Sequence, residues 1–159
     1  MAPKLHFGQE AILIHADNTH LLVGNGPSFM DVEIAATIKP DGTEEKKTIK
    51  NTTIYKKKEG VVVQHQDVII SYVNAEVSAK KAKEYQANVL ILTKPQEKLI
   101  EKIKPKLVVI MNSNVYAARE LNKKTGLQVI AAQQGTTIDL DDYSALSKQK
   151  ALSKFIEEK

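Results

Sequence analysis

Several residue types are missing or nearly missing from this sequence. It has no cysteine and no tryptophan, and Arg119 is the single arginine among its 23 basic residues. The absence of cysteine excludes disulfide frameworks, thiolate zinc sites, iron–sulfur clusters and cysteine nucleophiles. Because lysine lacks the bidentate fork of arginine, and because aromatic residues for base stacking are few, sequence-specific reading of nucleic acid is disfavoured.

Long apolar runs are missing as well. No stretch approaches the roughly 18 to 20 consecutive apolar residues of a membrane span, and Met1–His6 lacks the apolar core and cleavage site of a secretory peptide. The 159 residues, with a net charge of +4 and a pI near 9.1, fit one domain that can bury a core without disulfides. We therefore expect a single cytoplasmic domain over residues 1–159, with no membrane partner.

The first half of the sequence predicts β-structure. Apolar or alternating runs predict strands at 11–16, 19–23, 31–38, 49–55, 60–63 and 68–72. The first two runs flank Asp17-Asn18 and the last two flank Gln66-Asp67, which predicts two hairpins. The first hairpin should end at Gly24-Asn25-Gly26-Pro27, a run of turn-forming residues.

From residue 77 onward the pattern alternates between helix and strand. Helices are predicted at 78–86, 95–104, 114–124 and 142–158, and strands at 88–93, 107–110, 127–132 and 136–140. Strands such as Val89-Leu90-Ile91-Leu92 are apolar on both faces, so each face needs a covering layer. We therefore predict an α/β fold, an αββα-like layered mixed sheet with a β-rich N-terminal half.

Consecutive elements of the second half carry a resemblance to a known fold. They are the strand within Lys104–Ile110 with the helix after it, the run Lys124–Ala132, the Gly135 turn and Ile138-Asp139-Leu140. This order resembles the C-terminal half of the metallo-β-lactamase fold, in particular its archaeal and bacterial metal-dependent hydrolases. The Ala11–Pro27 hairpin resembles the opening of the same fold, in which two strands lead to a Gly-Pro loop.

The resemblance also implies a metal site whose ligands this sequence lacks. The hydrolases of that family hold one or two metals with a His-x-His-x-Asp-His loop after an early strand, but no histidine lies between Pro27 and Gly60. The bridging aspartate of the family falls near Asn74-Ala75, and its late histidine falls at about Asn112. We therefore expect a truncated, degenerate form of the fold, with an internal deletion, no catalytic residues, no metal and no cofactor.

The four histidines are His6, His15, His20 and His65, and they are the remaining candidates for a reduced metal site. His15 and His20 should face each other about 5 Å apart across the first hairpin, where Asp17 could join them in holding a metal. The alternative is an ordinary polar hairpin tip. His65 lies with Asp67 at the second turn, and His6 stands alone near the N-terminus.

The densest charge cluster comprises six lysines interleaved with Glu44, Glu45 and Glu59, namely Lys46, Lys47, Lys50, Lys56, Lys57 and Lys58. Lys56, Lys57 and Lys58 are the candidates for a patch that binds nucleic acid or other anions without sequence preference. The alternative is a solvated edge strand whose lysines discourage pairing with another sheet.

Other patterns typical of functional sites are incomplete. Gly24–Ser28 could cradle an anion with backbone amides, but the segment after it looks extended rather than helical. Ser71 and Ser113 lie at predicted strand ends without a Gly-x-Ser-x-Gly elbow or a histidine partner.

Three hypotheses follow from the sequence. The first is a non-catalytic remnant of the metallo-β-lactamase fold that binds a protein partner or assembles into a homo-oligomer. The second is a divergent metal-dependent hydrolase or nuclease with a reduced site built from His15, His20, His65 and Asp17 or Asp67. The third is a lysine-driven, non-specific nucleic-acid binder.

Overall fold

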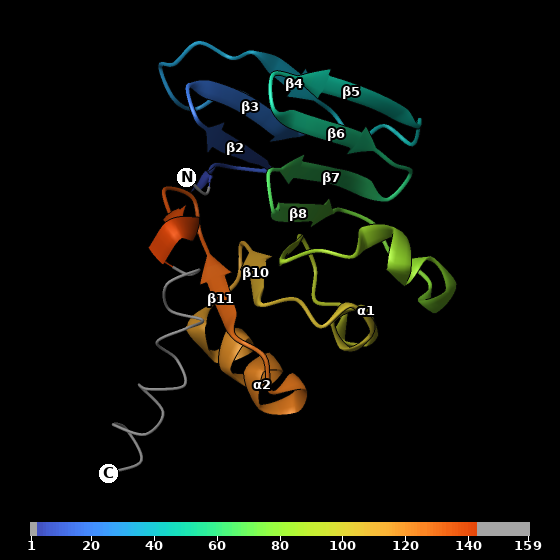
Figure 1. The fold of residues 1–159 in the computed structure, drawn as a ribbon. Coiled ribbons are helices and arrows are strands. Elements are labelled where there is room, and N and C mark those ends of the chain that lie inside the picture. Colours follow the sequence, from blue (N-terminus) through green and yellow to red (C-terminus); the bar gives the residue numbers. More distant parts are fainter. Residues whose placement is uncertain (1–2, 143–159) are drawn as a thin grey trace.

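The computed structural model describes residues 3–142, which form two β-sheets, three short helical segments between strands and a helical turn over 140–142 (Figure 1). The strands are β1 (Lys4–Phe7), β2 (Ala11–Ala16), β3 (Thr19–Gly24), β4 (Ala36–Ile38), β5 (Glu45–Ile49), β6 (Thr52–Lys56), β7 (Gly60–His65), β8 (Val68–Val73), β9 (Val89–Leu92), β10 (Leu107–Met111), β11 (Val129–Ala132) and β12 (Thr137–Asp139). The helical segments are the 3₁₀ helix η1 (Ala79–Tyr85) and the α-helices α1 (Glu97–Ile103) and α2 (Val115–Thr125).

The strands divide into a five-stranded sheet A and a seven-stranded sheet B. Sheet A has the order β12-β1-β2-β3-β4, and sheet B has the order β11-β10-β9-β8-β7-β6-β5. Hairpin turns join the antiparallel strands β5 to β8, whereas β8, β9, β10 and β11 run parallel and are joined through η1, α1 and α2. The last strand, β12, belongs to sheet A and pairs there with β1. Segments from both halves of the chain therefore form sheet A.

The main core lies between the two sheets. Alternate residues of each strand point inward, and the buried set includes Leu5, Ile12, Ile14 and Leu21 from sheet A and Ile54, Val63, Ile70 and Ile91 from sheet B. A second core lies on the other face of sheet B, where Tyr85, Leu99 and Leu121 of the three helical segments pack on the strands. The strands of sheet B that are apolar on both faces are therefore covered on both sides, as predicted.

The outer face of sheet A is covered by loop rather than by helix within residues 3–142. Phe29, Val32 and Ile34, all partly buried, pack against a small cluster formed by Ala11, Leu13 and Leu22. The strand predicted over 31–38 is therefore wrong except for β4. The apolar side chains before Ala36 pack over the outer face of sheet A and do not belong to a strand. The stretch between Pro27 and Gly60 holds the three strands β4, β5 and β6.

Most other predicted elements are confirmed with small changes of boundary. The first hairpin has the predicted register, with Ala16 paired to Thr19 across a turn in which Asp17 has φ 53°. The single strand predicted over 49–55 is instead a hairpin of β5 and β6 that turns at Lys50-Asn51. The helix predicted over 142–158 lies, apart from its first residue, outside the described residues.

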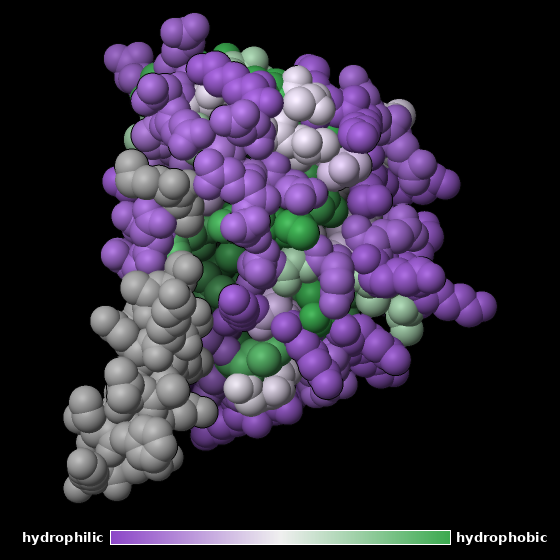
Figure 2. Space-filling view, viewed as in Figure 1, coloured by the Kyte–Doolittle hydropathy of each residue, from purple (hydrophilic) through white to green (hydrophobic). Residues whose placement is uncertain are grey.

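One face of the molecule is mainly polar. Figure 2 shows this face as largely hydrophilic, with apolar side chains exposed mostly near its middle and some near its upper edge. Within residues 3–142, no helix combines the length and the apolar character that a bilayer span requires.

Candidate functional site

The carboxyl ends of β8, β9, β10 and β11 meet at one edge of sheet B, because these strands are parallel. The residues that directly follow them are Asn74, Thr93, Asn112 and Gln133. Ligands of open α/β sheets commonly bind outside this kind of edge. We therefore take the carboxyl edge of sheet B as the candidate site.

Backbone hydrogen bonds fix the positions of Asn74 and Asn112, while the side chains of these two residues stay available. The backbone N–H of Asn74 donates to the Glu59 carbonyl at 3.0 Å, and that of Asn112 donates to the Ala132 carbonyl at 2.8 Å. Asn112 has φ 53°, a left-handed conformation that asparagine tolerates better than most residues. Within residues 3–142 neither asparagine side chain forms a hydrogen bond, so both amides can bind a ligand or partner.

A hollow of about 870 Å³ opens beside this edge, between residues 74–79 and 93–101. Gln96 braces its two walls, since its Nε2 donates to the Ala75 carbonyl at 2.9 Å and its Oε1 accepts from the Val77 N–H at 3.0 Å. The charged side chains that line the hollow are Glu76, Lys94, Glu97, Lys98 and Glu101. Because both signs of charge are present, the hollow favours a polar ligand over a strongly charged one.

Two apolar side chains are exposed just beyond the end of β10. Val115 and Tyr116, in the first turn of α2, are 56% and 77% exposed. The Asn114 side chain caps this helix by accepting from the Ala117 N–H at 2.9 Å, which holds the first turn in place. Met30, at 36%, is the other large hydrophobic residue that the described part of the chain exposes. A tyrosine displayed on a rigid helix end is typical of contact surfaces.

The donors at this edge do not fit the metal site that the fold resemblance implies. The strand-end side chains are neutral amides and a hydroxyl, whereas water-activating sites use imidazoles and carboxylates. Across residues 3–142 no group of three or more histidine, aspartate or glutamate side chains is placed to hold a metal ion.

His15 and His20 are brought together as predicted. They are paired across β2 and β3, and their rings stack with centroids 4.1 Å apart and planes 10° apart. Both lie on the outer face of sheet A, because their neighbours Ile14 and Leu21 point into the core. Partial burial and the nearby His15 lower the pKa of His20. Burial, followed by the charges of His15, His20 and Lys4, lowers the pKa of His6.

His65 is separated from this pair. It lies on the inward face of β7, 1% exposed, and its Nδ1 is 2.9 Å from the Oγ1 of Thr52. Its Nε2 faces the Asp17 carboxylate at 3.5 Å, so Asp17 turns toward sheet B and not toward the histidine pair. Asp67 is exposed at the β7–β8 turn. The structure therefore does not bring these residues together, because His15 and His20 lie on the outer face of sheet A whereas His65 lies on the inward face of sheet B.

The lysine cluster of the sequence is partly neutralised. The Lys56 ammonium lies 3.0 Å from the Asp41 carboxylate, and that of Lys57 lies 3.8 Å from the Glu84 carboxylate. Lys46 lies over the Tyr55 ring, with its Nζ 5.5 Å from the ring centroid. Lys58 is exposed. Since β5 is the outermost strand of sheet B, Lys46 and Lys47 lie on a sheet edge, where lysine opposes pairing with other sheets.

The remaining sequence candidates have structural roles. Ser71 is fully buried and donates to the Tyr85 carbonyl at 2.9 Å, so it cannot meet a substrate. The N–H groups of Asn25 and Gly26 both donate to the Glu10 carbonyl, at 3.0 and 2.9 Å, and are not free to cradle an anion. The Ser113 carbonyl accepts from the Gln133 side chain at 3.2 Å.

Sequence reasoning missed the exposed pair Val115 and Tyr116 and the brace formed by Gln96. The pair could have been found, because Val115 and Tyr116 follow directly on the predicted cap Asn114, where the apolar stripe of a helix need not face the core. The brace could not, because it joins residues about twenty positions apart in the sequence.

The arrangement of strands and helices is similar to that of several solved structures. Isothiocyanate hydrolase from Delia radicum gut bacteria aligns with a TM-score of 0.62 at 10% identity, covering 86% of this chain and 98% of that one. Igni18, a metallo hydrolase from the archaeon Ignicoccus hospitalis, aligns with a TM-score of 0.58 at 10% identity, covering 87% and 98%. The metallo-β-lactamase fold protein YhfI from Bacillus subtilis aligns with a TM-score of 0.59 at 9% identity, covering 87% and 100%.

At the level of sequence, neither a protein-family model nor a curated protein matches this chain. The structural matches confirm the predicted fold, with its mixed sheets and few helices. At such low identity they show the fold alone.

Proposed function

Because the chain has the metallo-β-lactamase fold, we propose that it is a non-catalytic form of that fold, acting as a protein-binding or self-assembling module through the carboxyl edge of sheet B. The observation that carries the proposal is the set of side chains at this edge. Asn74 and Asn112 stand at the strand ends where the fold resemblance implies metal ligands, and their amides are neutral and unpaired within the described residues. Amides of this kind serve in recognition, because they can both donate and accept hydrogen bonds.

The exposed apolar pair supports a protein partner over a small substrate. Tyrosine combines a large apolar ring with a polar tip, and it is enriched at the centres of protein interfaces. Val115 and Tyr116 follow Asn112 by only a few residues, so exposed apolar side chains are available close to the same strand end. A second copy of this chain is the partner that we propose first.

Self-assembly can be tested by multi-angle light scattering over a range of protein concentrations. We expect the wild-type chain to associate and a Val115→Ser/Tyr116→Ser variant to remain monomeric. Met30→Ser is the matched control, since it removes the other exposed large hydrophobic residue of the described part. A wild-type protein that stays monomeric at the highest concentration, or a double variant that associates equally well, would contradict self-assembly through this surface.

The competing function is a divergent metal-dependent hydrolase. The observation in its favour is that structural neighbours are named as hydrolases, among them isothiocyanate hydrolase and Igni18. Metal analysis of protein purified without an affinity tag separates the two functions. Substoichiometric zinc, manganese and iron are expected for the non-catalytic module, whereas one equivalent of any of them, together with hydrolysis of a generic ester that is lost on chelation, would overturn it.

A further inference from the structure

The 3₁₀ helix η1 sorts its side chains onto three separate faces. In a 3₁₀ helix the side chains at positions i and i+3 eclipse each other, so every third residue shares a face. Ala79, Ala82 and Tyr85 form the inward face, of which Ala82 and Tyr85 are buried against sheet B. The remaining residues of η1 and Gln86 are therefore divided between two outward faces.

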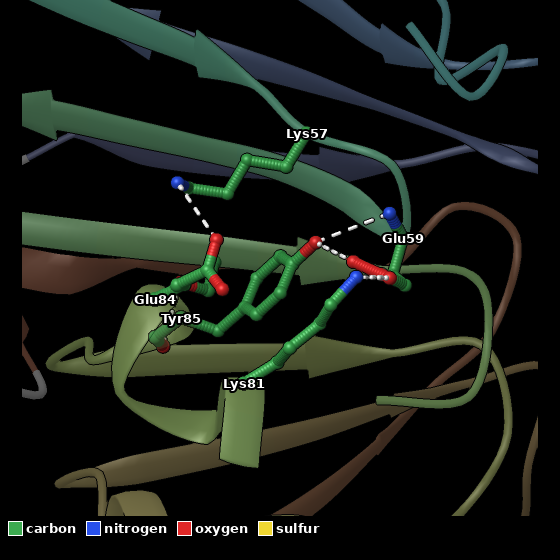
Figure 3. Close-up of polar contacts among 6 residues, drawn as sticks. Lys57, Glu59, Lys81, Glu84 and Tyr85 are labelled. Carbon is green, nitrogen blue, oxygen red and sulfur yellow. Dashed lines mark hydrogen bonds and ion pairs between the residues drawn. The ribbon is translucent and has the colours of Figure 1, made fainter. Parts of the chain in front are cut away.

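The face formed by Lys81 and Glu84 is engaged in ion pairs (Figure 3). The Lys81 ammonium lies 3.0 Å from the Glu59 carboxylate, and the Glu84 carboxylate lies 3.8 Å from the Lys57 ammonium. Glu59 also accepts a hydrogen bond from the Tyr85 hydroxyl at 2.8 Å. These contacts fix η1 against the β6–β7 turn and set the direction of its other outward face.

The third face carries like charges with no counter-ion. Lys80, Lys83 and Gln86 share it, and together with Lys102 of α1 they line a hollow of about 350 Å³. The Gln86 side chain donates to the Ile103 carbonyl at 3.3 Å, which ties this face to the end of α1. No acidic residue lines the hollow, and none of its three lysines forms an ion pair within the described part of the chain.

The lysines of this hollow differ from Lys56 and Lys57 of the lysine cluster described from the sequence. Lys56 and Lys57 stand next to each other in the sequence but are matched by Asp41 and Glu84 in the structure. Lys80 and Lys83 stand one 3₁₀ turn apart on the same face and have no such partners. Like charges at this spacing repel each other and destabilise a helix. An anion in the hollow would remove that repulsion.

We propose that the hollow lined by Lys80, Lys83 and Lys102 binds a compact oligophosphate, such as a free di- or triphosphate or the phosphate chain of a small molecule. Lysine ammonium groups bind phosphate as point charges and form short charge-assisted hydrogen bonds with it. No aromatic side chain lines the hollow, so it offers no stacking platform for the bases of a nucleic acid. The proposal goes beyond the protein-binding function, because the hollow is lined by η1 and α1 and not by α2.

Calorimetric titration of the full chain with inorganic tripolyphosphate tests the proposal. We expect binding that weakens as sodium chloride is raised, and a loss of affinity of at least about tenfold in Lys80→Gln/Lys83→Gln/Lys102→Gln, which corresponds to 1.4 kcal/mol or more. The matched control is Lys47→Gln/Lys50→Gln/Lys58→Gln, which lowers the net charge equally at exposed lysines elsewhere. The control should keep the wild-type affinity.

Thermal unfolding shows whether the variants fold. The hollow variant should melt no lower than wild type without ligand, because a like-charge repulsion is removed, and tripolyphosphate should raise the melting temperature of wild type and control only. Lys102→Gln alone is a second variant, which changes no residue of η1. We expect it to lose affinity for tripolyphosphate, but less than the triple variant. Three results would each overturn the proposal. They are an equal loss of affinity in the control variant, no binding of tripolyphosphate to the wild type, and binding of single-stranded RNA without binding of tripolyphosphate.

Discussion

Glu59 and Tyr85 hold each other through two hydrogen bonds that run in opposite directions. The Tyr85 hydroxyl donates to the Glu59 carboxylate at 2.8 Å and accepts from the Glu59 backbone N–H at 3.1 Å (Figure 3). Tyr85 is fully buried, and burial together with the Glu59 carboxylate raises the pKa of its hydroxyl, so the donor keeps its proton at any physiological pH. This pair joins the helical layer to the β6–β7 turn.

Replacing the Tyr85 hydroxyl should weaken the fold. We expect Tyr85→Phe to lower the free energy of unfolding by about 1–3 kcal/mol, because the Glu59 N–H and carboxylate lose their partner in a poorly hydrated place. Urea unfolding followed by circular dichroism measures the change. Tyr116→Phe is the control, since that hydroxyl belongs to a side chain that is 77% exposed, and it should change stability by less than about 0.5 kcal/mol. Equal effects in the two variants would contradict this role of Tyr85.

Glu59 should also affect how the free energy of unfolding changes at acidic pH. Burial works to raise its pKa, but hydrogen bonds from Lys81 and Tyr85 outweigh burial and lower the pKa below the ordinary value of 4.5. As the pH falls below that value, the unfolded chain takes up the proton first, so the stabilisation present at higher pH is lost. We expect Glu59→Gln to be less stable than wild type near neutral pH and to lose less stability below about pH 4.5. Parallel acid profiles of wild type and variant would refute the assignment.

The local parts of the fold could be predicted from the sequence, whereas the long-range contacts could not. Two hairpins could be predicted from their turns, because a two-residue turn sets the register of the strands beside it. These turns are Asp17-Asn18 and Gln66-Asp67. The β5–β6 hairpin was missed, since its exposed lysines hide the alternation that marks a half-buried strand. The pairing of β12 with β1 joins residues more than 130 positions apart, and no local pattern encodes it.

The candidate site likewise has features that the sequence predicted and features that depend on long-range contacts. The positions of Asn74 and Asn112 at the strand ends came from the resemblance to a known fold, and the structure places both after parallel strands of sheet B. The contact of Asp17 with His65 depends instead on how the two sheets pack, so the sequence suggested the wrong partners for Asp17. The pairing of Lys56 with Asp41 and of Lys57 with Glu84 is likewise a tertiary effect, so the sequence alone could not show that these two lysines face carboxylates.

The histidines on sheet A should make stability depend on pH in the mildly acidic range. The pKa values of His6 and His20 are lowered from 6.5, so below that pH the unfolded chain binds more protons than the folded one and stability falls. Chemical denaturation at about pH 7.5 and about pH 5.5 measures this loss. We expect His15→Asn/His20→Asn to lose less stability than wild type over the same interval. An unchanged loss would show that other groups are responsible.

His65 should matter more for stability than its aspartate partner. It is 1% exposed and its Nδ1 lies beside the buried Thr52 hydroxyl, so His65→Ala would leave a cavity and an unpaired hydroxyl. We expect a loss of about 2–4 kcal/mol in the free energy of unfolding. Asp17→Asn keeps a residue that tolerates positive φ and alters only an exposed carboxylate, so its cost should stay below about 1 kcal/mol. A larger effect for Asp17→Asn would mean that the 3.5 Å contact dominates.

Gly60 and Gly42 should respond to alanine for different reasons. A Cβ on Gly60 would collide with the Tyr72 carbonyl oxygen of the neighbouring strand β8, and a paired backbone cannot move aside cheaply. We expect Gly60→Ala to cost about 3 kcal/mol, the upper part of the range for overpacking. Gly42 has no atom within 4 Å of such a Cβ but has φ +86°, so Gly42→Ala should cost only about 1 kcal/mol through backbone strain. Urea unfolding of both variants measures the difference, and equal costs would show that the collision at Gly60 is relieved by a shift of β7 against β8.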